Sequence, residues 1–368
     1  MKNKIVYIIG QLSVGGSEKY VVSLVKHIDK KQFRPTIICL SQTLELSNEL
    51  SKIDCDLHVI NYPSFNKIRT ILSLGIKLKK INPDIVHTVG RSWYYTIPAC
   101  YLAGIGNLII SSRSIPPWKK WYHRIVDRLL LKKVKLAMFN SYQGRKATWL
   151  DLGLPKSKSL VIHSAIDLEK FDEEQRLNLT TPISFLPTKN AISPIICIVA
   201  NLTPTKSLDT AIMAQKLLTE TYPDSQLWII GKGRSESQLK MLVSQLNIED
   251  NVQFLGRRIE IPKILKLVDI GLLTSISEGS SNSLLEYMAA SLPIIATKVG
   301  GTPEIIDHNT GILVPPKSPE SVFQAIIKLS ENPKLQSELG NAARKRVEKQ
   351  FSLYQMIDDT VKGYRSII

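Results

Sequence analysis

Short apolar runs alternate with longer amphipathic stretches along the whole chain. The runs have the length of buried strands, whereas the stretches between them are long enough for helices. This alternation is typical of βαβ units, which build parallel sheets covered by helices. We therefore predict an α/β protein with strands at Ile5–Ile9, Thr36–Leu40, Leu57–Ile60, Ile85–His87, Leu108–Ser111, Leu136–Asn140, Leu160–His163, Pro194–Val199, Gln226–Ile230, Val252–Phe254, Ile270–Leu273, Ile294–Ala296 and Gly311–Val314.

The length of the chain predicts two domains. Its 368 residues exceed one ordinary domain, for which about 150 residues is a reasonable prior. Between the two sets of strands, residues 177–193 are rich in Thr, Pro, Ser and Asn and lack periodicity, which is typical of a linker. We predict Rossmann-like domains at 1–176 and 194–350, two doubly wound sheets that face each other across a cleft.

Composition argues against a membrane span and against disulfides. No segment reaches the roughly 18 uninterrupted apolar residues that cross a bilayer, and the first apolar run is too short for a secretion signal. The cysteines are scattered without disulfide or zinc spacing, as expected of small buried residues in a reducing compartment. We therefore predict a cytoplasmic protein in which the thiols stay reduced at Cys39, Cys55, Cys100 and Cys197.

Positive charge is concentrated in the first half of the chain. Residues 1–180 carry 28 Lys and Arg against 14 Asp and Glu, a net charge of +14, whereas residues 181–368 have a net charge of +2. Ten of the cations lie between Arg113 and Lys146, where the only acid is Asp127. Apolar residues are interleaved with them at Trp118, Trp121, Tyr122 and Leu129–Leu131.

A basic segment with aromatic side chains suits an anionic membrane surface, which we predict as a partner of residues 113–146. A solvated helix face with core leucines behind it explains the same pattern. A basic stripe is also the footprint of a nucleic-acid binder. Nothing else along the chain favours nucleic acid, and we predict none.

The segment Ser-Glu-Gly-Ser-Ser-Asn-Ser-Leu-Leu-Glu at 277–286 carries two carboxylates eight residues apart. A short buried strand precedes it, and an apolar helical pattern begins at Asn282 or Ser283. Such a strand, turn and helix start bind anions, because unpaired backbone N–H groups and the positive end of the helix dipole meet there, with Asn or Ser as the cap. Glu278 lies in the loop and Glu286 about one turn inside the helix. A ligand with phosphate at the helix start could offer hydroxyl groups to both carboxylates, which describes a nucleotide sugar.

This segment and the one after it, Ala289-Ala-Ser-Leu-Pro-Ile-Ile-Ala-Thr-Lys-Val-Gly-Gly-Thr-Pro-Glu304, resemble the retaining glycosyltransferases of family 4 (glycosyltransferase group 1), which have the two-domain GT-B fold. The resemblance implies that Glu278 contacts hydroxyl groups of the donor sugar and that Glu286 holds the ribose. It also implies that the last helix, at 351–368, crosses back onto the first domain. The expected contacts to the donor phosphates come from Gly279, Ser280, Ser281, Asn282 and Ser283.

A glycine-rich loop, with Gly10, Gly15 and Gly16 ahead of Glu18, follows the first predicted strand. It lacks the G-x-G-x-x-G of dinucleotide-binding proteins, and Gly16 stands where a Walker A loop has Lys, which weakens nicotinamide and ATP as ligands. The Gly-Gly-x-Glu form is similar to the first loop of family 4. The resemblance implies that Gly15, Gly16 and Glu18 face the donor diphosphate, and a plain tight turn is the alternative.

Lys206 closes the loop after the strand Pro194–Val199. Family members usually have an Arg a few residues before this Lys, and the resemblance implies that the pair clamps the donor phosphates. Asn201 and Thr203 occupy the positions where the Arg is usual. We predict that further donor contacts come from Gly231, Arg234 and Arg257.

His87 ends a predicted strand, where its side chain would point beyond the carboxyl edge of the sheet. It resembles a family His at this position, so we predict a catalytic contact or a contact to the acceptor. A hydrogen-bonded strand-end histidine is the alternative. The second family His is absent after the next strand, and Arg113 stands there, which we predict to contact the acceptor.

No metal is predicted. Asp54-Cys55-Asp56 has the letters of a D-x-D motif, but it lies at the entry to a predicted strand, the wrong end for a ligand. No His/Cys cluster has zinc spacing. The diphosphate would instead be neutralised by Lys206, a helix dipole and glycine N–H groups.

We therefore predict a metal-independent retaining glycosyltransferase with Glu278, Lys206 and His87 as its catalytic residues. It would move a hexose from a UDP- or GDP-sugar to a glycan or lipid-linked acceptor, in the synthesis of capsule, O-antigen or exopolysaccharide, at the inner membrane face. Two alternatives stay open. One is a sugar-nucleotide epimerase on the same fold, and the other is a non-catalytic or weakly active sugar-nucleotide-binding protein, since the usual Arg is missing.

Overall fold

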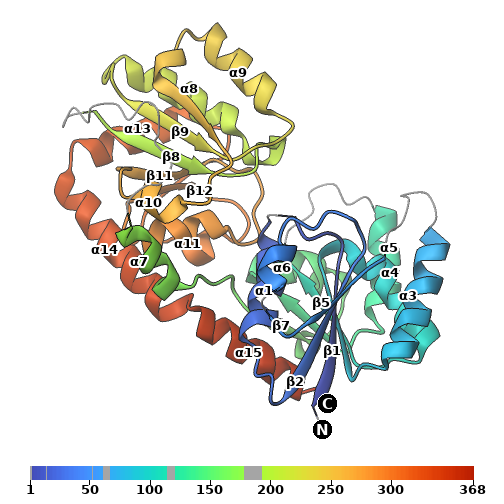
Figure 1. Cartoon of the computed structure of the whole chain (residues 1–368). Helices are drawn as coiled ribbons and strands as arrows, with labels where there is room; N and C mark the ends of the chain where they lie inside the picture. The colour runs from blue at the N-terminus through green and yellow to red at the C-terminus, as the bar shows by residue number, and fades with distance from the viewer. Residues whose placement is uncertain (1, 14, 52, 61–66, 114–120, 178–192) are drawn as a thin grey trace. The chain divides into compact units, whose positions relative to one another are not determined.

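The computed structural model describes the chain except for residues 1, 14, 52, 61–66, 114–120 and 178–192. Nearly all of the predicted linker and Trp118 therefore lie outside the described residues. The chain forms two compact units, one made of Met1–Ser164 with Tyr354–Ile368 and the other of Ala165–Leu353. Each unit is a parallel sheet with helices on both faces (Figure 1).

In the first unit, the described residues form a seven-stranded sheet in the order β3-β2-β1-β4-β5-β6-β7, with every neighbouring pair parallel. A strand forms at each expected apolar run, and the bounds differ from the prediction by one to three residues. The largest shift is at β2, which begins at Phe33 rather than Thr36. Their bounds are β1 (Asn3–Ile9), β2 (Phe33–Cys39), β3 (Asp56–Val59), β4 (Ile85–Val89), β5 (Leu108–Ser112), β6 (Leu136–Phe139) and β7 (Ser159–Val161).

The helices of this unit divide between the two faces of the sheet. Side chains of α3, α4 and α5 share one core with Val6 and Ile8 of β1. Because side chains alternate along a strand, Tyr7 between them points to the opposite face, where α15 packs. The bounds are α1 (Gly16–His27), α2 (Ser47–Leu50), α3 (Lys67–Ile81), α4 (Trp93–Ala103), α5 (Trp121–Leu131), α6 (Tyr142–Thr148) and α15 (Leu353–Arg365).

The second unit has a six-stranded parallel sheet in the order β10-β9-β8-β11-β12-β13, counted over the residues that the structure describes. Its strands are β8 (Ile195–Val199), β9 (Gln226–Ile230), β10 (Val252–Gly256), β11 (Ile270–Leu273), β12 (Ile294–Thr297) and β13 (Ile312–Val314). Its helices are α7 (Leu168–Arg176), α8 (Leu208–Thr219), α9 (Glu236–Gln245), α10 (Ile261–Leu265), α11 (Asn282–Ala289), α12 (Thr302–Ile305), α13 (Pro319–Ser330) and α14 (Pro333–Gln350).

Helix α7 lies in the second unit, although the expected boundary at residue 176 placed it in the first domain. Phe171 is buried in the core of the second sheet with Ile264 and Leu285. Asp172 accepts two hydrogen bonds from the Arg344 guanidinium of α14, at 2.8 and 2.7 Å. These contacts are remote in sequence, so local composition could not place the boundary.

Both sheets reverse their strand order once, between β1 and β4 in the first and between β8 and β11 in the second. At such a switch point the two neighbouring loops leave in opposite directions, and in open α/β sheets ligands bind there, beyond the carboxyl ends of the strands. The glycine loop follows β1, whereas Lys206 follows β8 and Glu278 follows β11. The topology therefore brings the predicted donor residues of the second unit to one place.

Tyr364 anchors the C-terminal helix α15 to the sheet of the first unit. The side chain is fully buried, and its hydroxyl donates to the Tyr7 hydroxyl at 3.2 Å and is hydrogen-bonded with His87 Nδ1 at 2.7 Å. Tyr20 of α1 reaches the same helix at Thr360, with 3.4 Å between the hydroxyl oxygens. The last helix of the chain is thus a structural part of the first unit.

Replacing Tyr364 by Phe should lower the free energy of unfolding by about 1–3 kcal/mol, because two buried polar groups lose a shared partner. Thermal or urea unfolding measures the change. Tyr354→Phe on the same helix is the matched control, since that side chain is 82% exposed, and it should have little effect. Equal stabilities for the two variants would contradict the anchoring role.

Candidate functional site

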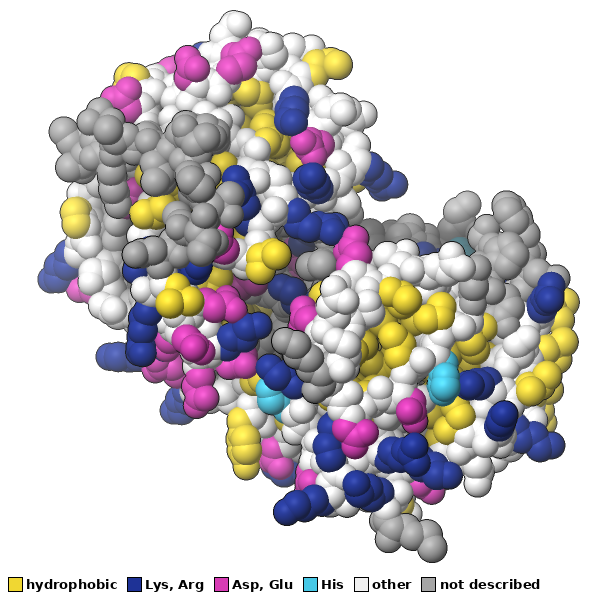
Figure 2. All heavy atoms as spheres, in the orientation of Figure 1, with side chains coloured by type: hydrophobic (Ala, Val, Ile, Leu, Met, Phe, Trp, Pro, Cys, Tyr) yellow, Lys and Arg dark blue, Asp and Glu magenta, His cyan; other side chains and the backbone are white. Residues whose placement is uncertain are grey.

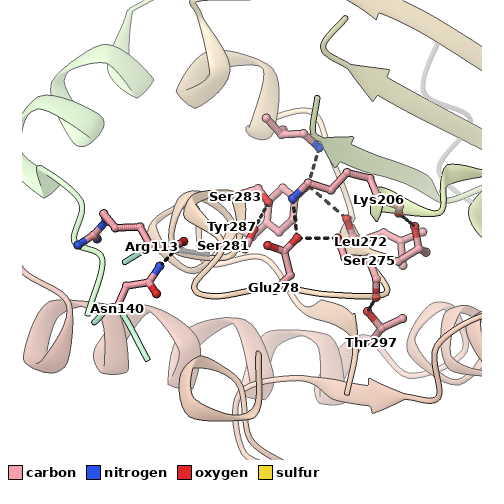
Figure 3. Close-up of polar contacts among 12 residues, drawn as sticks. Arg113, Asn140, Lys206, Leu272, Ser275, Glu278, Ser281, Ser283, Tyr287 and Thr297 are labelled. Atoms are coloured by element: carbon pink, nitrogen blue, oxygen red, sulfur yellow. Dashed lines mark hydrogen bonds and ion pairs between the residues drawn. The ribbon is translucent and has the colours of Figure 1, made fainter. Parts of the chain in front are cut away.

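Lys206 and Glu278 form an ion pair at the switch point of the second sheet. The Lys206 ammonium donates to Glu278 Oε1 at 2.5 Å, and the Ser275 hydroxyl donates to the same oxygen at 2.6 Å (Figure 3). The Glu278 side chain is only 10% exposed and that of Lys206 23%. A carboxylate so far removed from water needs a cation or hydrogen-bond donors beside it. Glu278 has the Lys206 ammonium as its cation and the Ser275 hydroxyl as a further donor.

The two loops that carry this pair are joined by their backbones. Ile276 N–H donates to the Thr205 carbonyl at 2.9 Å, and the Thr274 hydroxyl donates to the Lys206 carbonyl at 3.0 Å. Lys206 ends the short helical turn Pro204–Lys206, and Ser207 after it has φ of +45°, in the left-handed region that non-glycine residues rarely occupy. The position of Lys206 is therefore fixed by contacts on both sides of it.

The backbone of Glu278 is held as firmly as its side chain. Gly301 N–H donates to the Glu278 carbonyl at 3.0 Å, and a Cβ on Gly300, where φ is +49°, would collide with that carbonyl. The Thr297 hydroxyl donates to the Ser275 carbonyl at 2.6 Å. No role was expected for Ser275, Thr297 or Gly300, although Gly300 belongs to the Gly-Gly pair in the segment that resembles family 4.

Helix α11 begins at Asn282, as predicted, with Ser281 at the N-cap position. The predicted side-chain cap is not formed, because the Ser281 hydroxyl is hydrogen-bonded with that of Ser283 at 2.9 Å. The first N–H groups of a helix have no partner inside it. The Ser280 hydroxyl in the adjoining turn is buried and has no hydrogen-bond partner among the described residues. This end of α11 thus presents donors that a bound anion can satisfy.

Glu286 is half-buried in α11. Burial first, and then the charge of Glu286, raise the pKa of Cys197 on β8, which places this carboxylate near that strand. The next residue, Tyr287, accepts a hydrogen bond from Val199 N–H at 2.8 Å, and its ring lies against Gly271 with no room for a Cβ between them. Tyr287 therefore fixes α11 to both strands of the switch point.

The other predicted donor residues of the second unit lie in the loops after β9 and β10. Gly231 has φ of +141°, and its Cβ would collide with the Ala200 carbonyl, so its glycine is explained by backbone packing. Arg234 is exposed in the loop after β9, next to the Lys206 loop in the sheet order. Arg257 is exposed after β10, the edge strand, which is two strands from β8. Arg234 is the better placed of the two arginines.

The glycine loop of the first unit leads into α1 with Gly15 at the N-cap position and Gly16 as the first helical residue. A Cβ on Gly15 would collide with the Glu18 carboxylate, so that side chain folds back over the start of its own helix. Burial raises the pKa of Glu18. The loop follows β1 at the switch point of the first sheet, and the contact of Gly15, Gly16 and Glu18 with the donor diphosphate stays a prediction.

His87 is enclosed within the first unit. Its side chain is 0% exposed, Nδ1 is hydrogen-bonded with the Tyr364 hydroxyl and Nε2 with the Ser111 hydroxyl, each at 2.7 Å. Burial, with the charge of Arg113 as a second cause, lowers the pKa of His87 to about 3. His87 was expected to end its strand, but β4 continues to Val89, so the side chain lies in the middle of the strand and is enclosed. Both of its nitrogens are hydrogen-bonded within the unit, which agrees with the alternative of a hydrogen-bonded structural histidine.

Arg113 is held by its neighbours in the first unit. Its guanidinium lies 3.9 Å from the centre of the Tyr20 ring and donates to the Ser164 hydroxyl at 2.9 Å, while Asn140 Nδ2 donates to the Arg113 carbonyl. Burial lowers the pKa of Arg113. The guanidinium is thus a preorganised cation, and its contact to an acceptor stays a prediction.

Among the described residues, no group of three or more His, Cys, Asp or Glu is arranged to hold a metal ion. Asp56 of the Asp54-Cys55-Asp56 sequence lies at the amino end of β3. No helix in the described ranges is long and apolar enough to cross a membrane.

Comparison with known proteins identifies the family. The model of the glycosyl transferases group 1 matches residues 183–346, which contain the Lys206–Glu278 pair, and the model of glycosyltransferase family 4 matches residues 14–170. The chain belongs to the group 1, family 4-like glycosyltransferases. Helix α11 also lies within residues 183–346, the part of the chain that the group 1 model matches.

Several curated glycosyltransferases are similar in sequence. The chain is 32% identical to N-acetyl-alpha-D-glucosaminyl L-malate synthase of Bacillus anthracis over 47% of its own length and 46% of that protein. It is 32% identical to the amylovoran biosynthesis glycosyltransferase AmsK of Erwinia amylovora over 55% and 49%. These matches span about half of those relatives. A Campylobacter jejuni N-acetylgalactosaminyltransferase that is named for a diphospho-undecaprenol substrate is 25% identical over 96% and 97%.

Solved structures show the same fold over the whole chain. Anabaena HepE in complex with UDP has a TM-score of 0.82 at 18% identity, covering 100% of both chains. A glycosyltransferase from Rickettsia africae has a TM-score of 0.83 at 23% identity, covering 100% of this chain and 98% of that one. The fold is GT-B, as the resemblance implied.

The low pKa of His87 predicts a loss of stability in mild acid. In the unfolded chain the imidazole takes up a proton near its ordinary pKa of 6.5, whereas the folded chain resists protonation down to about 3. The unfolded state therefore binds more protons as the pH falls below 6.5, and this histidine alone should cost about 2 kcal/mol of stability between pH 7 and 5.

Unfolding measured at both pH values tests this. His87→Gln should have a shallower pH dependence, whereas His308→Gln, at an exposed position, should keep that of the wild type. An unchanged pH dependence in His87→Gln would mean that the buried imidazole is not its source.

Proposed function

We propose that the protein is a retaining glycosyltransferase that moves a sugar from a nucleoside-diphosphate sugar to a glycan or lipid-linked acceptor. The observation that carries the proposal is the Lys206–Glu278 pair at the switch point of the second sheet, beside the start of α11. Family membership supports it, and so do neighbours of the same fold that were solved with UDP or UDP-glucose.

The donor phosphates would lie at the N-terminus of α11, within reach of Lys206. The ammonium of Lys206 is paired with Glu278. A bound diphosphate offers it a second anion, and the carboxylate is then free to accept hydrogen bonds from hydroxyl groups of the sugar. Glu286, on the same helix, would hold the ribose. One ion pair thus prepares both halves of the donor site.

Catalysis would rest on electrostatic stabilisation of the leaving group. The bond between the anomeric carbon and the diphosphate breaks while the acceptor oxygen bonds to the same carbon from the same face, and its proton passes to the departing phosphate oxygen. Negative charge grows on the diphosphate, next to Lys206 and the first N–H groups of α11. Fixed donors at such a position contribute more to the rate than mobile water does.

We further propose a role in cell-surface polysaccharide synthesis on the cytoplasmic side. Relatives named for amylovoran biosynthesis and for a diphospho-undecaprenol substrate favour this class of acceptor. No metal is required in the proposed mechanism, because Lys206 and the helix start supply the positive charge.

Thermal unfolding of the full chain with UDP, GDP and their sugars should identify the donor class. A ligand at a hundred times its Kd stabilises the fold by about 2.7 kcal/mol. One nucleotide class should raise the Tm, and Glu286→Ala should abolish the shift. Glu338→Gln, at an exposed position of α14, is the matched control and should respond like the wild type. No shift with any nucleotide would contradict the donor site.

The product should keep the anomeric configuration of the donor. Proton NMR of the transferred or hydrolysed sugar, read early in the reaction, reports it through the coupling between H1 and H2. EDTA should leave the rate unchanged, and Glu278→Gln should lower it by about 100-fold or more, the effect typical of losing one preorganised polar contact in a transition state. An inverted product, or a rate abolished by EDTA, would overturn the corresponding part of the proposal.

A non-catalytic sugar-nucleotide-binding protein is the second candidate. It is favoured by Asn201 and Thr203, which stand where the family usually has the second phosphate-binding cation. Such a protein would show the thermal shift without releasing nucleotide in the presence of any acceptor.

A further inference from the structure

Helix α3 of the first unit carries an apolar stripe on its solvent side. Ile68, Leu72 and Ile76 are 71%, 50% and 72% exposed. Their spacing of four residues places them along one line of the helix. The opposite side of α3 is buried in the core through Leu74 and Leu78. The helix is therefore apolar on two faces, and packing within the unit explains only one of them.

Helices α4 and α5 continue this surface. Leu102 of α4 is 56% exposed, and its Cβ lies against Gly75 of α3, so it borders the stripe. Tyr94 of α4 donates to Asp127 Oδ1 of α5 at 2.6 Å, which holds α5 beside α4. We call the exposed side of α3, α4 and α5 the three-helix surface. Of the 18 exposed large apolar side chains in the described chain, eight lie on it: Ile68, Leu72, Ile76, Tyr101, Leu102, Ile125, Val126 and Leu129.

The charge on the three-helix surface is of one sign. The three helices contain a single acid, Asp127, and it is fully buried. Exposed cations stand beside the apolar side chains, at Lys67, Arg69, Lys79 and Lys80 of α3, at Arg124 and Arg128 of α5, and at Lys132 and Lys133 directly after it. Figure 2 shows apolar and basic side chains together on the edge of the first unit where Figure 1 labels α3 and α4.

We propose that the three-helix surface binds an anionic lipid bilayer. Apolar side chains that enter the acyl boundary, with Lys and Arg around them at the level of the headgroups, are the pattern of an interfacial helix. A second copy of this surface would bring cations against cations. Nucleic acid would use the cations but would leave the isoleucines and leucines in water.

The assigned surface differs from the segment 113–146 that the sequence indicated. Arg113 is half-buried and donates to Ser164 of its own unit, and Arg145 stands over the Tyr142 ring of α6. The stripe of α3 lies outside that segment, and residues 114–120 are outside the described chain. Membrane binding through the three-helix surface does not depend on the donor site, and it can be measured without enzymatic activity.

Sedimentation of the full chain with vesicles tests the proposal. The protein should bind vesicles of phosphatidylcholine mixed equally with phosphatidylglycerol, bind phosphatidylcholine alone much more weakly, and dissociate as salt is raised. Leu72→Glu with Ile76→Glu should weaken binding by at least about tenfold, and Lys132→Glu with Lys133→Glu by a similar factor. All variants are first shown to unfold at the wild-type Tm.

Matched controls are taken from the second unit. Met241→Glu is an exposed apolar position on α9, and Lys334→Glu is an exposed cation on α14. Both should bind vesicles like the wild type. The proposal is overturned if the protein binds no anionic vesicle, or if the apolar variants bind as well as the controls. It is also overturned if those variants instead abolish a dimer seen by light scattering, or if only RNA is bound and only the lysine variants weaken it.

Discussion

A nearly buried carboxylate, Glu278, is the constraint on which the second unit depends. Such a group must be paired, and its partner Lys206 comes from the loop of a different strand. Several features that look unrelated in the sequence serve this pair. Ser275 donates to the carboxylate, Thr297 holds the Ser275 backbone, and Gly300 leaves room for the Glu278 carbonyl. The parallel sheet brings the loops of β8 and β11 together, and these contacts decide how the side chains meet.

The two units use the same topology differently. Each has a switch point with a loop at the carboxyl edge, but the histidine in the middle of β4 (Ile85–Val89) is turned into the protein. His87 there binds Tyr364 and Ser111 and helps to hold the C-terminal helix. In the second unit the corresponding edge carries the Lys206–Glu278 ion pair and the start of α11. The first unit has, in addition, a cluster of cations on α3 and α5, beside exposed isoleucines and leucines.

Much of the fold could be predicted because buried parallel strands are continuous apolar runs, and each predicted strand is present in the described chain. The start of α11 could be predicted from local sequence. Small polar residues follow the apolar run of β11, and apolar residues with helical spacing begin directly after them. The predictions for His87 and α7 were wrong because both depend on contacts between residues far apart in the sequence. His87 is enclosed by Tyr364, 277 residues away, and α7 is placed in the second unit by its pairing with Arg344. The predicted side-chain cap of α11 is not formed because the hydroxyl groups of Ser281 and Ser283 are hydrogen-bonded to each other.

The central claim is that Lys206 binds the donor diphosphate after leaving Glu278, and calorimetric titration of the full chain with UDP and GDP tests it most directly. Wild type, Lys206→Ala, Glu278→Gln and the double variant form one cycle, with Lys334→Ala as an exposed control. Lys206→Ala should weaken binding of the nucleotide by about 10- to 100-fold, since a charge-assisted contact contributes roughly 1.5–3 kcal/mol. Glu278→Gln, which frees Lys206 from its carboxylate, should leave the bare nucleotide bound as tightly or more tightly, while it weakens the nucleotide sugar. Equal affinity of wild type and Lys206→Ala for the nucleotide would contradict the account.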